Sequence, residues 1–502
     1  MNYIIVQAGG KGTRLEYLTK NKPKALVPVE NLPMLFHLFR MYPDKRFIII
    51  ADYKRDVMRQ YLNAFADVKY RIVEATGTKT ASGIQQALEL IPADEPFMLV
   101  WSDLILPTTL KLPKDYATDG GLPSEDYIGI SSAFSCRWKY ENGAFDEERS
   151  TDHGVAGFFL FRNKSTLADV PESGELVRWM QSQNMHFAEL SLAGAREFGL
   201  LSEYEALPKE KCRPFNRITV KDNILTKEPI DDQGRKLSVD ECAWYEKART
   251  LDLSILPKIY STHPLKMEYI QGKNIYDCKL NRAEQKRVLE VLIAALNQLH
   301  ESDCVPTDYF SMHEAYFHKT VARLSKIRDM LPFAKERTIR VNGRNCRNVY
   351  FCFDELEKRL EQLRCEKFQF IHGDCTFSNL MLRNTGEPVL IDPRGYFGFT
   401  KLYGDARYDW AKLYYSVAGN YDRFNLKEFR LDIGERDVEL SIASSGWEAM
   451  EDVFFKLTGA DRDEIRLLHA VIWLSLTTYA WQDYDSVCGA FYNGLWYLEE
   501  VL

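Results

Sequence analysis

The chain lacks the features of several large protein classes. Its ten cysteines include no Cys-x-x-Cys pair, which indicates reduced, mostly buried thiols rather than a disulfide framework or a zinc site. The longest apolar runs, Phe97–Trp101 and Ala470–Leu476, fall far short of the roughly 20 residues of a membrane span. The N-terminus has no basic segment followed by a cleavage site, so no secretory signal is indicated and we expect a cytoplasmic protein.

The chain also has no excess of basic charge, no internal repeat and no low-complexity tract. The net charge of −7 argues against a nucleic-acid partner, which would require a basic surface. Hydrophobic residues make up 45% and aromatic residues 13% of the chain, which indicates a fully folded protein. Because domains usually have roughly 100–200 residues, the 502 residues predict two compact units. The oligomeric state is left open.

The first 110 residues alternate strand-like and helix-like segments. This alternation predicts a Rossmann-like α/β domain with a parallel sheet. The predicted strands are Tyr3–Gln7, Phe47–Ala51, Val68–Glu74, Phe97–Trp101 and, later, Val155–Arg162, and the predicted helices are Met34–Tyr42, Arg55–Phe65 and Ile84–Ile91. The polar stretch from Pro113 to Gly143 is predicted to be an insertion between strands.

A charged, irregular stretch around Ala206–Arg213 separates this pattern from a second one. We therefore predict domains at 1–207 and 208–502. Two short β runs, a helix near Ser238–Thr250 and a strand at Lys266–Ile270 come first, and long amphipathic helices follow from Arg282 onward. The second domain is predicted to be α+β, with a small sheet-containing lobe (about 213–272) and a helical lobe (about 273–502).

A glycine-rich turn directly follows the first strand. Glycines let a backbone approach phosphate closely, while exposed N–H groups and cations offset its charge. The residues of this predicted phosphate site are Gly9, Gly10, Lys11, Gly12, Thr13, Arg14 and, ten residues further on, Lys24. For an isolated motif, a tight structural turn with a solvated lysine is the favoured alternative.

The pairing of AGGKGTRL with PKALVPV resembles the signature of the nucleotidyltransferase family that makes nucleotide sugars and CDP-choline-type products. By this resemblance, Gly77–Gly83 is the nucleoside-contacting loop, with Gly83 as a binding residue, and Gly154–Gly157 is the product-side glycine segment. Asp103 and Glu197 would be the Mg²⁺ ligands, with glutamate where many members carry the aspartate of Asp-x-Gly. The alternatives are a turn residue for Asp103 and a surface carboxylate for Glu197.

In the reaction that this resemblance implies, a phosphate attacks the α-phosphorus of a nucleoside triphosphate, CTP or UTP. Mg²⁺ on the two carboxylates, together with Lys24 and Arg14, would reduce the repulsion between the anions and stabilise the pyrophosphate leaving group.

The segment from Phe370 to Gly395 carries the second motif. Asp374 precedes Asn379 by five residues, and Asp392 follows after a short β run, which matches the base and two metal ligands of a kinase catalytic loop. HGDxxxxN with IDPRG resembles the aminoglycoside phosphotransferase and choline kinase superfamily, which implies a two-lobed protein-kinase-like fold. By this resemblance Asp374 accepts the substrate hydroxyl proton, while Asn379 and Asp392 hold Mg²⁺ on ATP. The alternative is a chance combination of two turns.

Further kinase residues are assigned from their order in the chain. Lys227, on a predicted strand, would bind ATP phosphates, with Glu241 as its ion-pair partner, and Glu268 would lie at the adenine hinge. Arg394 would contact phosphate or cap the hairpin. A strand lysine is often merely a solvated edge residue. The first two strands of this domain are not joined by a glycine-rich loop, which leaves the phosphate lid unexplained.

Two features of the remaining chain bear on these predictions. Asp409 is expected to support the catalytic loop. The tail is aromatic and is expected to form core packing rather than a cation–π cage for choline. Its aromatic residues are Trp473, Tyr479, Trp481, Tyr484, Phe491, Tyr492, Trp496 and Tyr497.

Together the motifs predict a bifunctional enzyme. The kinase would phosphorylate a small alcohol or sugar with ATP, and the transferase would couple that phosphate to a nucleotide, giving an activated precursor for surface polysaccharide or lipid decoration. One alternative keeps both folds and takes choline or ethanolamine with CTP. Another is that one domain is an inactive binding module.

Overall fold

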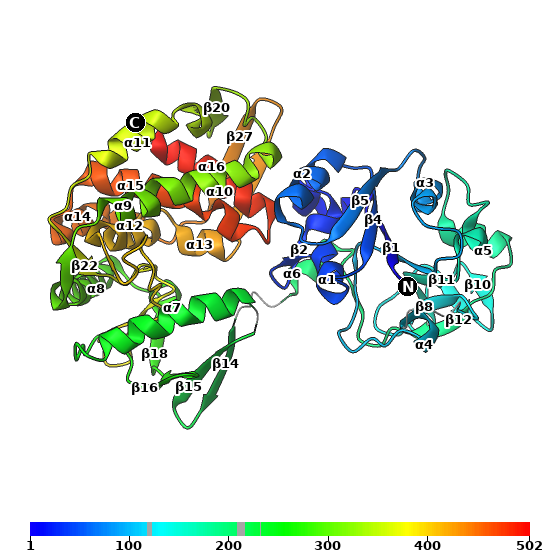
Figure 1. The fold of residues 1–502 in the computed structure, drawn as a ribbon, viewed down its shortest axis with the longest axis horizontal. Helices are drawn as coiled ribbons and strands as arrows, with labels where there is room; N and C mark the ends of the chain where they lie inside the picture. Colours follow the sequence, from blue (N-terminus) through cyan, green and yellow to red (C-terminus); the bar gives the residue numbers. More distant parts are fainter. Residues whose placement is uncertain (118–122, 208–215, 231) are drawn as a thin grey trace. The chain divides into compact units, whose positions relative to one another are not determined.

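The computed structural model describes residues 1–117, 123–207, 216–230 and 232–502 (Figure 1). The chain divides into two compact units: Met1–Pro208 with Gln482–Asp485, and Lys209–Trp481 with Ser486–Leu502. The predicted boundary at 207/208 adjoins residues 208–215, which lie outside the described residues, and stays a prediction. Within the ranges that are described, no helix has both the length and the apolar character needed to cross a bilayer.

The N-terminal unit is built on a nine-stranded sheet with the order β10-β9-β11-β6-β1-β4-β5, in which β8 extends from β11 and β12 from β8. Strands β6, β1, β4 and β5 are parallel, as predicted. The interior of β1 is fully buried at Ile4–Val6, as expected for a strand covered on both faces. The strands are β1 Tyr3–Gln7, β4 Arg46–Ala51, β5 Lys69–Glu74, β6 Phe97–Trp101, β8 Tyr127–Ser131, β9 Lys139–Glu141, β10 Ala144–Asp146, β11 Gly154–Phe161 and β12 Ala188–Ser191.

Helices and short β pairs complete this unit. In α2, buried Met58, Tyr61 and Leu62 recur at helical spacing and give the helix one apolar face. The helices are α1 Met34–Met41, α2 Arg55–Phe65, α3 Ile84–Glu89, α4 Lys114–Ala117, α5 Leu176–Ser182 and α6 Leu201–Glu205, and the short pairs are β2 Pro28–Val29 with β3 Leu32–Pro33 and β7 Leu104–Ile105 with β13 Arg196–Glu197.

The structure corrects one part of the sequence-based prediction in this unit. The stretch from Pro113 to Gly143, predicted to be an insertion, contributes β8 and β9 to the main sheet, and only its residues 118–122 lie outside the description. Strand β8 was not predicted because Gly129 interrupts the apolar run of its sequence. A Cβ at Gly129 would lie 2.6 Å from Leu192 and 2.8 Å from Phe158, so glycine is required by close packing. In addition, β11 runs antiparallel to β6, so the sheet is mixed.

The C-terminal unit begins with an antiparallel sheet in the order β14-β15-β17-β16, and α7 packs against β15 and β16 (Figure 1). Its elements are β14 Asn216–Lys221, β15 Ile224–Pro229, α7 Asp232–Ala248, β16 Ile259–Thr262 and β17 Leu265–Glu268. Helix α7 starts earlier than predicted. The prediction missed its first turns because they are mostly exposed and show no apolar periodicity. The tight β14–β15 turn is made by Asp222 and Asn223 in left-handed conformation, which explains how it forms without glycine.

The rest of this unit is mainly helical, as predicted, and carries three small sheets. Its helices are α8 Arg282–Ser302, α9 Tyr309–His313, α10 Lys319–Ile327, α11 Phe353–Glu361, α12 Ala406–Val417, α13 Tyr421–Asn425, α14 Glu451–Thr458, α15 Arg462–Leu476 and α16 Tyr484–Leu498. The sheets are β18 Gly272–Asn274 with β23 Leu380–Arg383 and β24 Pro388–Leu390; β19 Cys304–Pro306 with β22 Lys367–Phe370 and β25 Tyr403–Gly404; and β20 Thr338–Val341 with β21 Arg344–Arg347, β26 Phe429–Ile433 and β27 Asp437–Ile442.

Two candidate active sites

The glycine turn of the N-terminal unit lies against Lys24. Gly12 has a φ of +64°, and a Cβ there would lie 3.0 Å from Lys24 Cβ and 3.1 Å from Thr19 Cγ2. Its carbonyl accepts a hydrogen bond from Leu15 N at 2.9 Å, which helps to start the short helix Thr13–Thr19. Glycine is therefore required here by both conformation and space, and Lys24 is held beside the turn. Gly9 and Gly10, the other two glycines of the predicted phosphate site, directly precede this turn.

Asp103 and Glu197 come together from distant parts of the sequence. Asp103 follows β6, and Glu197 lies on β13, paired with Leu104 of β7. Phe198 N donates to Asp103 O at 3.3 Å, and Lys24 Nζ forms an ion pair with Asp103 Oδ2. The structure thus joins three predicted residues, Lys24, Asp103 and Glu197.

The charge of this site is poorly balanced. Burial and the nearby charge of Asp103 raise the pKa of Glu197 to about 7, although Lys24 and Arg14 act in the opposite direction. A Cβ at Gly199 would lie 2.9 Å from Glu197 Oε1 and 3.3 Å from Arg14 Nη2, which places Arg14 beside the same carboxylate. Two adjacent carboxylates offer oxygen ligands of the type that Mg²⁺ prefers.

Gly83 and Gly157 have structural reasons for being glycine. Gly83 has a φ of +77° and precedes α3, and a Cβ there would lie 2.4 Å from Ile50 Cγ2. Gly157 has a φ of +76°, and its Cβ would lie 2.1 Å from the Trp101 ring. The amide of Gln7 donates to Thr80 O and so ties the end of β1 to the predicted nucleoside loop.

Cys136 is a residue of this site that the sequence gave no reason to select. It is buried, and burial together with the negative charges of Glu197 and Asp103 raises the pKa of its thiol to about 12. The thiol is therefore protonated at neutral pH.

In the C-terminal unit, Asp409 binds the backbone at the start of the loop that runs from His372 to Asn379. Its Oδ2 accepts from His372 N at 2.8 Å and its Oδ1 from Gly373 N at 2.7 Å, while His300 Nε2 lies 2.9 Å from Oδ2. Burial alone would raise the pKa of Asp409, but the hydrogen bond and charge of His300 lower it overall. The predicted supporting role of Asp409 is confirmed by these contacts.

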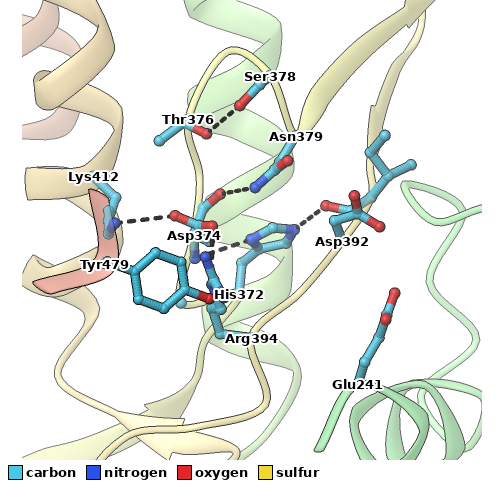
Figure 2. A network of polar contacts seen from close by, with 12 residues as sticks. Glu241, His372, Asp374, Thr376, Ser378, Asn379, Asp392, Arg394, Lys412 and Tyr479 are labelled. Carbon is cyan, nitrogen blue, oxygen red and sulfur yellow. Dashed lines mark hydrogen bonds and ion pairs between the residues drawn. The ribbon is translucent and has the colours of Figure 1, made fainter. Parts of the chain in front are cut away.

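Asp374 lies between two cations (Figure 2). Arg394 Nε donates to its Oδ2 at 3.0 Å, and Lys412 Nζ lies 3.0 Å from its Oδ1. The amide nitrogen of Asn379 donates to Asp374 O at 2.9 Å, so the two predicted residues are joined directly. Lys412 was not predicted, although its position three residues after Asp409 places both on one face of α12.

Lys227 links the small sheet to Asp392. Its Nζ lies 2.9 Å from both carboxylate oxygens of Glu241 and 2.8 Å from Asp392 Oδ1. Burial and the charge of Asp392 raise the pKa of Glu241 to about 7, partly offset by Lys227. Burial would also raise the pKa of Asp392, but the Lys227 ammonium lowers it overall. Asp392 has a φ of +54°, an uncommon conformation for aspartate, of a kind often found at functional sites.

The predicted metal ligands of this unit fit a hard cation. Asn379 uses its amide nitrogen on Asp374 O, which leaves its side-chain oxygen available for another partner. Ile391 N donates to Asn379 O at 3.0 Å, which keeps Asn379 beside the strand that leads to Asp392. An amide oxygen and a carboxylate are a suitable ligand pair for Mg²⁺, which would neutralise charge on the ATP phosphates when bound.

Two further predicted residues make contacts that refine their roles. Arg383 binds the Glu268 carboxylate through Nη1 at 2.5 Å and Nη2 at 2.9 Å, so this side chain joins β17 to the β23–β24 hairpin. Arg394 binds Asp374 and donates to the Tyr479 hydroxyl at 2.6 Å, a contact that neither alternative for Arg394 had anticipated.

A cavity of about 170 Å³ opens beside Asp374 and Arg394. Lys319, Arg323, Lys412 and Tyr479 are among its other lining residues. Of the aromatic tail residues, Trp473, Tyr484, Phe491 and Tyr492 are buried, as expected for core packing, whereas Tyr479 faces this cavity.

Each of the two units contains a segment that matches a family model. Residues 3–114 match the family model described as Nucleotidyl transferase, and residues 247–450 match the Phosphotransferase enzyme family. Each of the two families that the sequence motifs predicted is thus matched by one part of the chain.

Relatives of established description match the N-terminal part. UTP--glucose-1-phosphate uridylyltransferase AglF of Haloferax volcanii is 34% identical over 113 residues, which is 21% of this chain and 45% of that protein. Glucose-1-phosphate cytidylyltransferase of Salmonella typhimurium is 29% identical over 139 residues, covering 22% of this chain and 54% of that protein. The chain therefore spans about half the length of these relatives.

Two solved structures align with a part of the chain. HddC from Yersinia pseudotuberculosis aligns with 41% of this chain and 97% of its own, at 19% identity and a TM-score of 0.35. Choline kinase LicA from Streptococcus pneumoniae aligns with 57% of this chain and 91% of its own, at 16% identity and a TM-score of 0.39.

Proposed function

We propose that this chain catalyses two consecutive transfers. The C-terminal unit phosphorylates a small alcohol or sugar with ATP. The N-terminal unit then transfers a nucleotidyl group from CTP or UTP to the resulting phosphate and releases pyrophosphate. The product is a nucleoside-diphosphate-activated precursor, which we assign to surface polysaccharide or lipid decoration.

The kinase assignment rests on one observation. The loop that carries Asp374 and Asn379 lies beside the strand that leads to Asp392, and Lys227 of the small sheet forms an ion pair with Asp392. Phosphoryl transfer needs positioning and charge neutralisation more than covalent chemistry. Asp374 positions the acceptor hydroxyl and takes its proton. Lys227 neutralises ATP phosphate, and Asn379 and Asp392 hold Mg²⁺.

The nucleotidyltransferase assignment is supported by the meeting of Lys24, Asp103 and Glu197 beside the glycine turn. Two anions react in this transfer, so cations must be gathered around them. Lys24 and Arg14 supply fixed positive charge, and the two carboxylates hold Mg²⁺. The relatives named for uridylyl and cytidylyl transfer to glucose 1-phosphate support UTP or CTP as the nucleotide.

Paired variants of the full chain test both assignments. Asp374→Asn is expected to lower ATP-dependent phosphorylation by about 10²–10⁴-fold, the usual contribution of a general base, while pyrophosphate release from CTP or UTP with a supplied sugar phosphate continues. Asp103→Asn is expected to do the reverse. The controls are the exposed carboxylates Asp452→Asn and Asp56→Asn, which lie on α14 and α2.

The result also decides between active enzyme and binding module. Loss of one activity in each variant supports two working sites. If ADP formation persists in Asp374→Asn, the kinase assignment is wrong. If the wild-type chain binds CTP and UTP but releases no pyrophosphate with any supplied phosphate, the N-terminal unit is a binding module.

A further inference from the structure

The cavity beside Asp374 has an excess of positive charge. Its lining includes the cations Lys319, Arg323, Arg394 and Lys412 but only two carboxylates, Asp240 and Asp374. Arg394 and Lys412 are engaged by Asp374 at 3.0 Å each. The positive charge in excess of the Asp374 contacts therefore lies on Lys319 and Arg323.

Lys319 and Arg323 lack carboxylate partners within the described part of the chain. Arg323 Nη1 donates to Ser475 O at 2.6 Å and to Ser475 Oγ at 3.0 Å, both uncharged acceptors, and the Lys319 ammonium lies 5.4 Å from the centre of the Tyr408 ring. Burial lowers the pKa of both groups, as expected for desolvated cations that no anion compensates. The two residues are four positions apart on α10 and so share one face of that helix.

Three of the five tyrosine rings that line the cavity, those of Tyr408, Tyr415 and Tyr479, already carry protein cations. Lys319 lies 5.4 Å from the ring centre of Tyr408, Lys412 lies 5.5 Å from that of Tyr415, and Arg394 and Arg323 lie 5.0 and 5.7 Å from that of Tyr479. A quaternary ammonium would have to compete with these cations for the rings and would meet like charge. The cavity is therefore poorly suited to choline or ethanolamine.

We propose that the acceptor of the kinase is an anionic alcohol. Its hydroxyl faces Asp374, and a carboxylate or phosphate elsewhere in the same molecule binds Lys319 and Arg323. This inference rests on the proposed kinase function and narrows its substrate class. The cavity volume of about 170 Å³ suits a compact acceptor such as a small sugar acid or polyol phosphate.

Matched acceptors test the charge requirement. ADP formation by the full chain is measured with glycerate, glycerol 1-phosphate, glycerol, ethanolamine and choline, followed by glucuronate, glucose 6-phosphate and glucose. The kcat/KM for at least one anionic acceptor is expected to exceed that for its neutral counterpart by about tenfold or more, since a hydrogen bond to a charged group contributes that much. Preference for the carboxylate or for the phosphate identifies the anion. Preference for a neutral or cationic acceptor overturns the inference while leaving the kinase assignment intact.

Variants locate the anion. Lys319→Met and Arg323→Met are expected to raise the KM for the anionic acceptor by about tenfold or more, with little change in the KM for ATP. Arg323→Lys should restore part of the loss. The matched control is Lys326→Met, an exposed lysine on the same helix. A rise confined to the KM for ATP would instead assign Lys319 and Arg323 to the nucleotide and overturn the inference.

Binding separates failure of this inference from failure of the kinase assignment. Calorimetry with glycerate and glycerol 1-phosphate is performed in the presence of Mg²⁺ and a non-hydrolysable ATP analogue, so that the nucleotide site is filled. Anion binding that is lost in Lys319→Met, without turnover of any acceptor, would support the anion site and refute the kinase function. Absence of binding by both anions, or binding unchanged in Lys319→Met and Arg323→Met, would refute the anion site.

Discussion

The two sites handle negative charge in different ways. In the N-terminal unit, Asp103 and Glu197 lie side by side with one lysine in direct contact, and the pKa of Glu197 rises to about 7. In the C-terminal unit, Asp374 binds two cations and Asp392 binds Lys227. The Asp374 carboxylate is thus neutralised by side chains of its own unit, whereas Asp103 and Glu197 keep uncompensated charge that a divalent cation would relieve.

Among the lysine replacements, removal of Lys227 should have the largest effect. Lys227→Met leaves Glu241 and Asp392 facing each other without a cation, so ATP-dependent phosphorylation should fall by about 10²–10³-fold. ADP formation and pyrophosphate release are measured in parallel, with Lys221→Met, an exposed lysine on β14, as the control. Equal loss of both activities would show that the two sites are not independent.

Removal of Lys24 should have a similar but smaller effect on the other activity. Lys24→Met frees Asp103 and removes one of the cations near the predicted phosphates, so nucleotidyl transfer should fall by about 10²-fold. Because the site then carries more uncompensated negative charge, the Mg²⁺ concentration for half-maximal activity should be lower in this variant. Lys69→Met on β5 serves as the control, and unchanged pyrophosphate release in Lys24→Met would contradict the proposed role.

Gly157→Ala should affect the stability of the N-terminal unit. The new Cβ would lie 2.1 Å from the Trp101 ring at a φ of +76°, so the expected cost is about 2–4 kcal/mol from strain and overpacking together. Gly194→Ala isolates the conformational part, because Gly194 has a similar φ of +84° and the nearest atom to its Cβ position, Pro107 Cβ, lies at 3.6 Å. Denaturant unfolding followed by tryptophan fluorescence measures both variants, and equal losses would mean that the Trp101 contact has no cost.

Acid should weaken the C-terminal unit through His469. Burial lowers the pKa of His469 from 6.5 to about 3, and its Nε2 accepts from Trp473 Nε1 at 2.9 Å, so the folded state holds the neutral form. Below pH 6.5 the unfolded chain binds a proton that the folded chain does not. The free energy of unfolding therefore decreases as the pH is lowered, by up to about 1.4 kcal/mol per pH unit, until about pH 3. His469→Gln keeps an acceptor for Trp473 and should lose less stability between about pH 7 and pH 5 in urea titrations. An unchanged pH dependence would contradict this assignment.

Local motifs allowed much of both sites to be predicted. The turn at Gly12 and the loop from His372 to Asn379 are set by short-range requirements on conformation and spacing, which a sequence displays directly. The strands β1, β4 and β6 were also predictable, because largely buried parallel strands are continuous apolar runs.

Other features depend on contacts between distant residues. Strand β8 contains Gly129, which has a low strand propensity but allows close packing against Leu192 and Phe158. In the sequence, Lys319 and Arg323 have the pattern of ordinary surface cations on an amphipathic helix. Only the tertiary fold brings them to the cavity beside Asp374. The Glu268 carboxylate was expected at the hinge, yet its partner Arg383 lies more than a hundred residues away.

The contact between Lys227 and Asp392 has a consequence for nucleotide exchange. In the proposed kinase, ATP would have to displace Asp392 from Lys227, which it contacts at 2.8 Å, so part of the binding free energy would go into separating this pair. Salt weakens such a pair and also weakens the attraction of Lys227 for phosphate. The affinity for ATP should therefore vary less with ionic strength than the charge of the nucleotide alone would suggest.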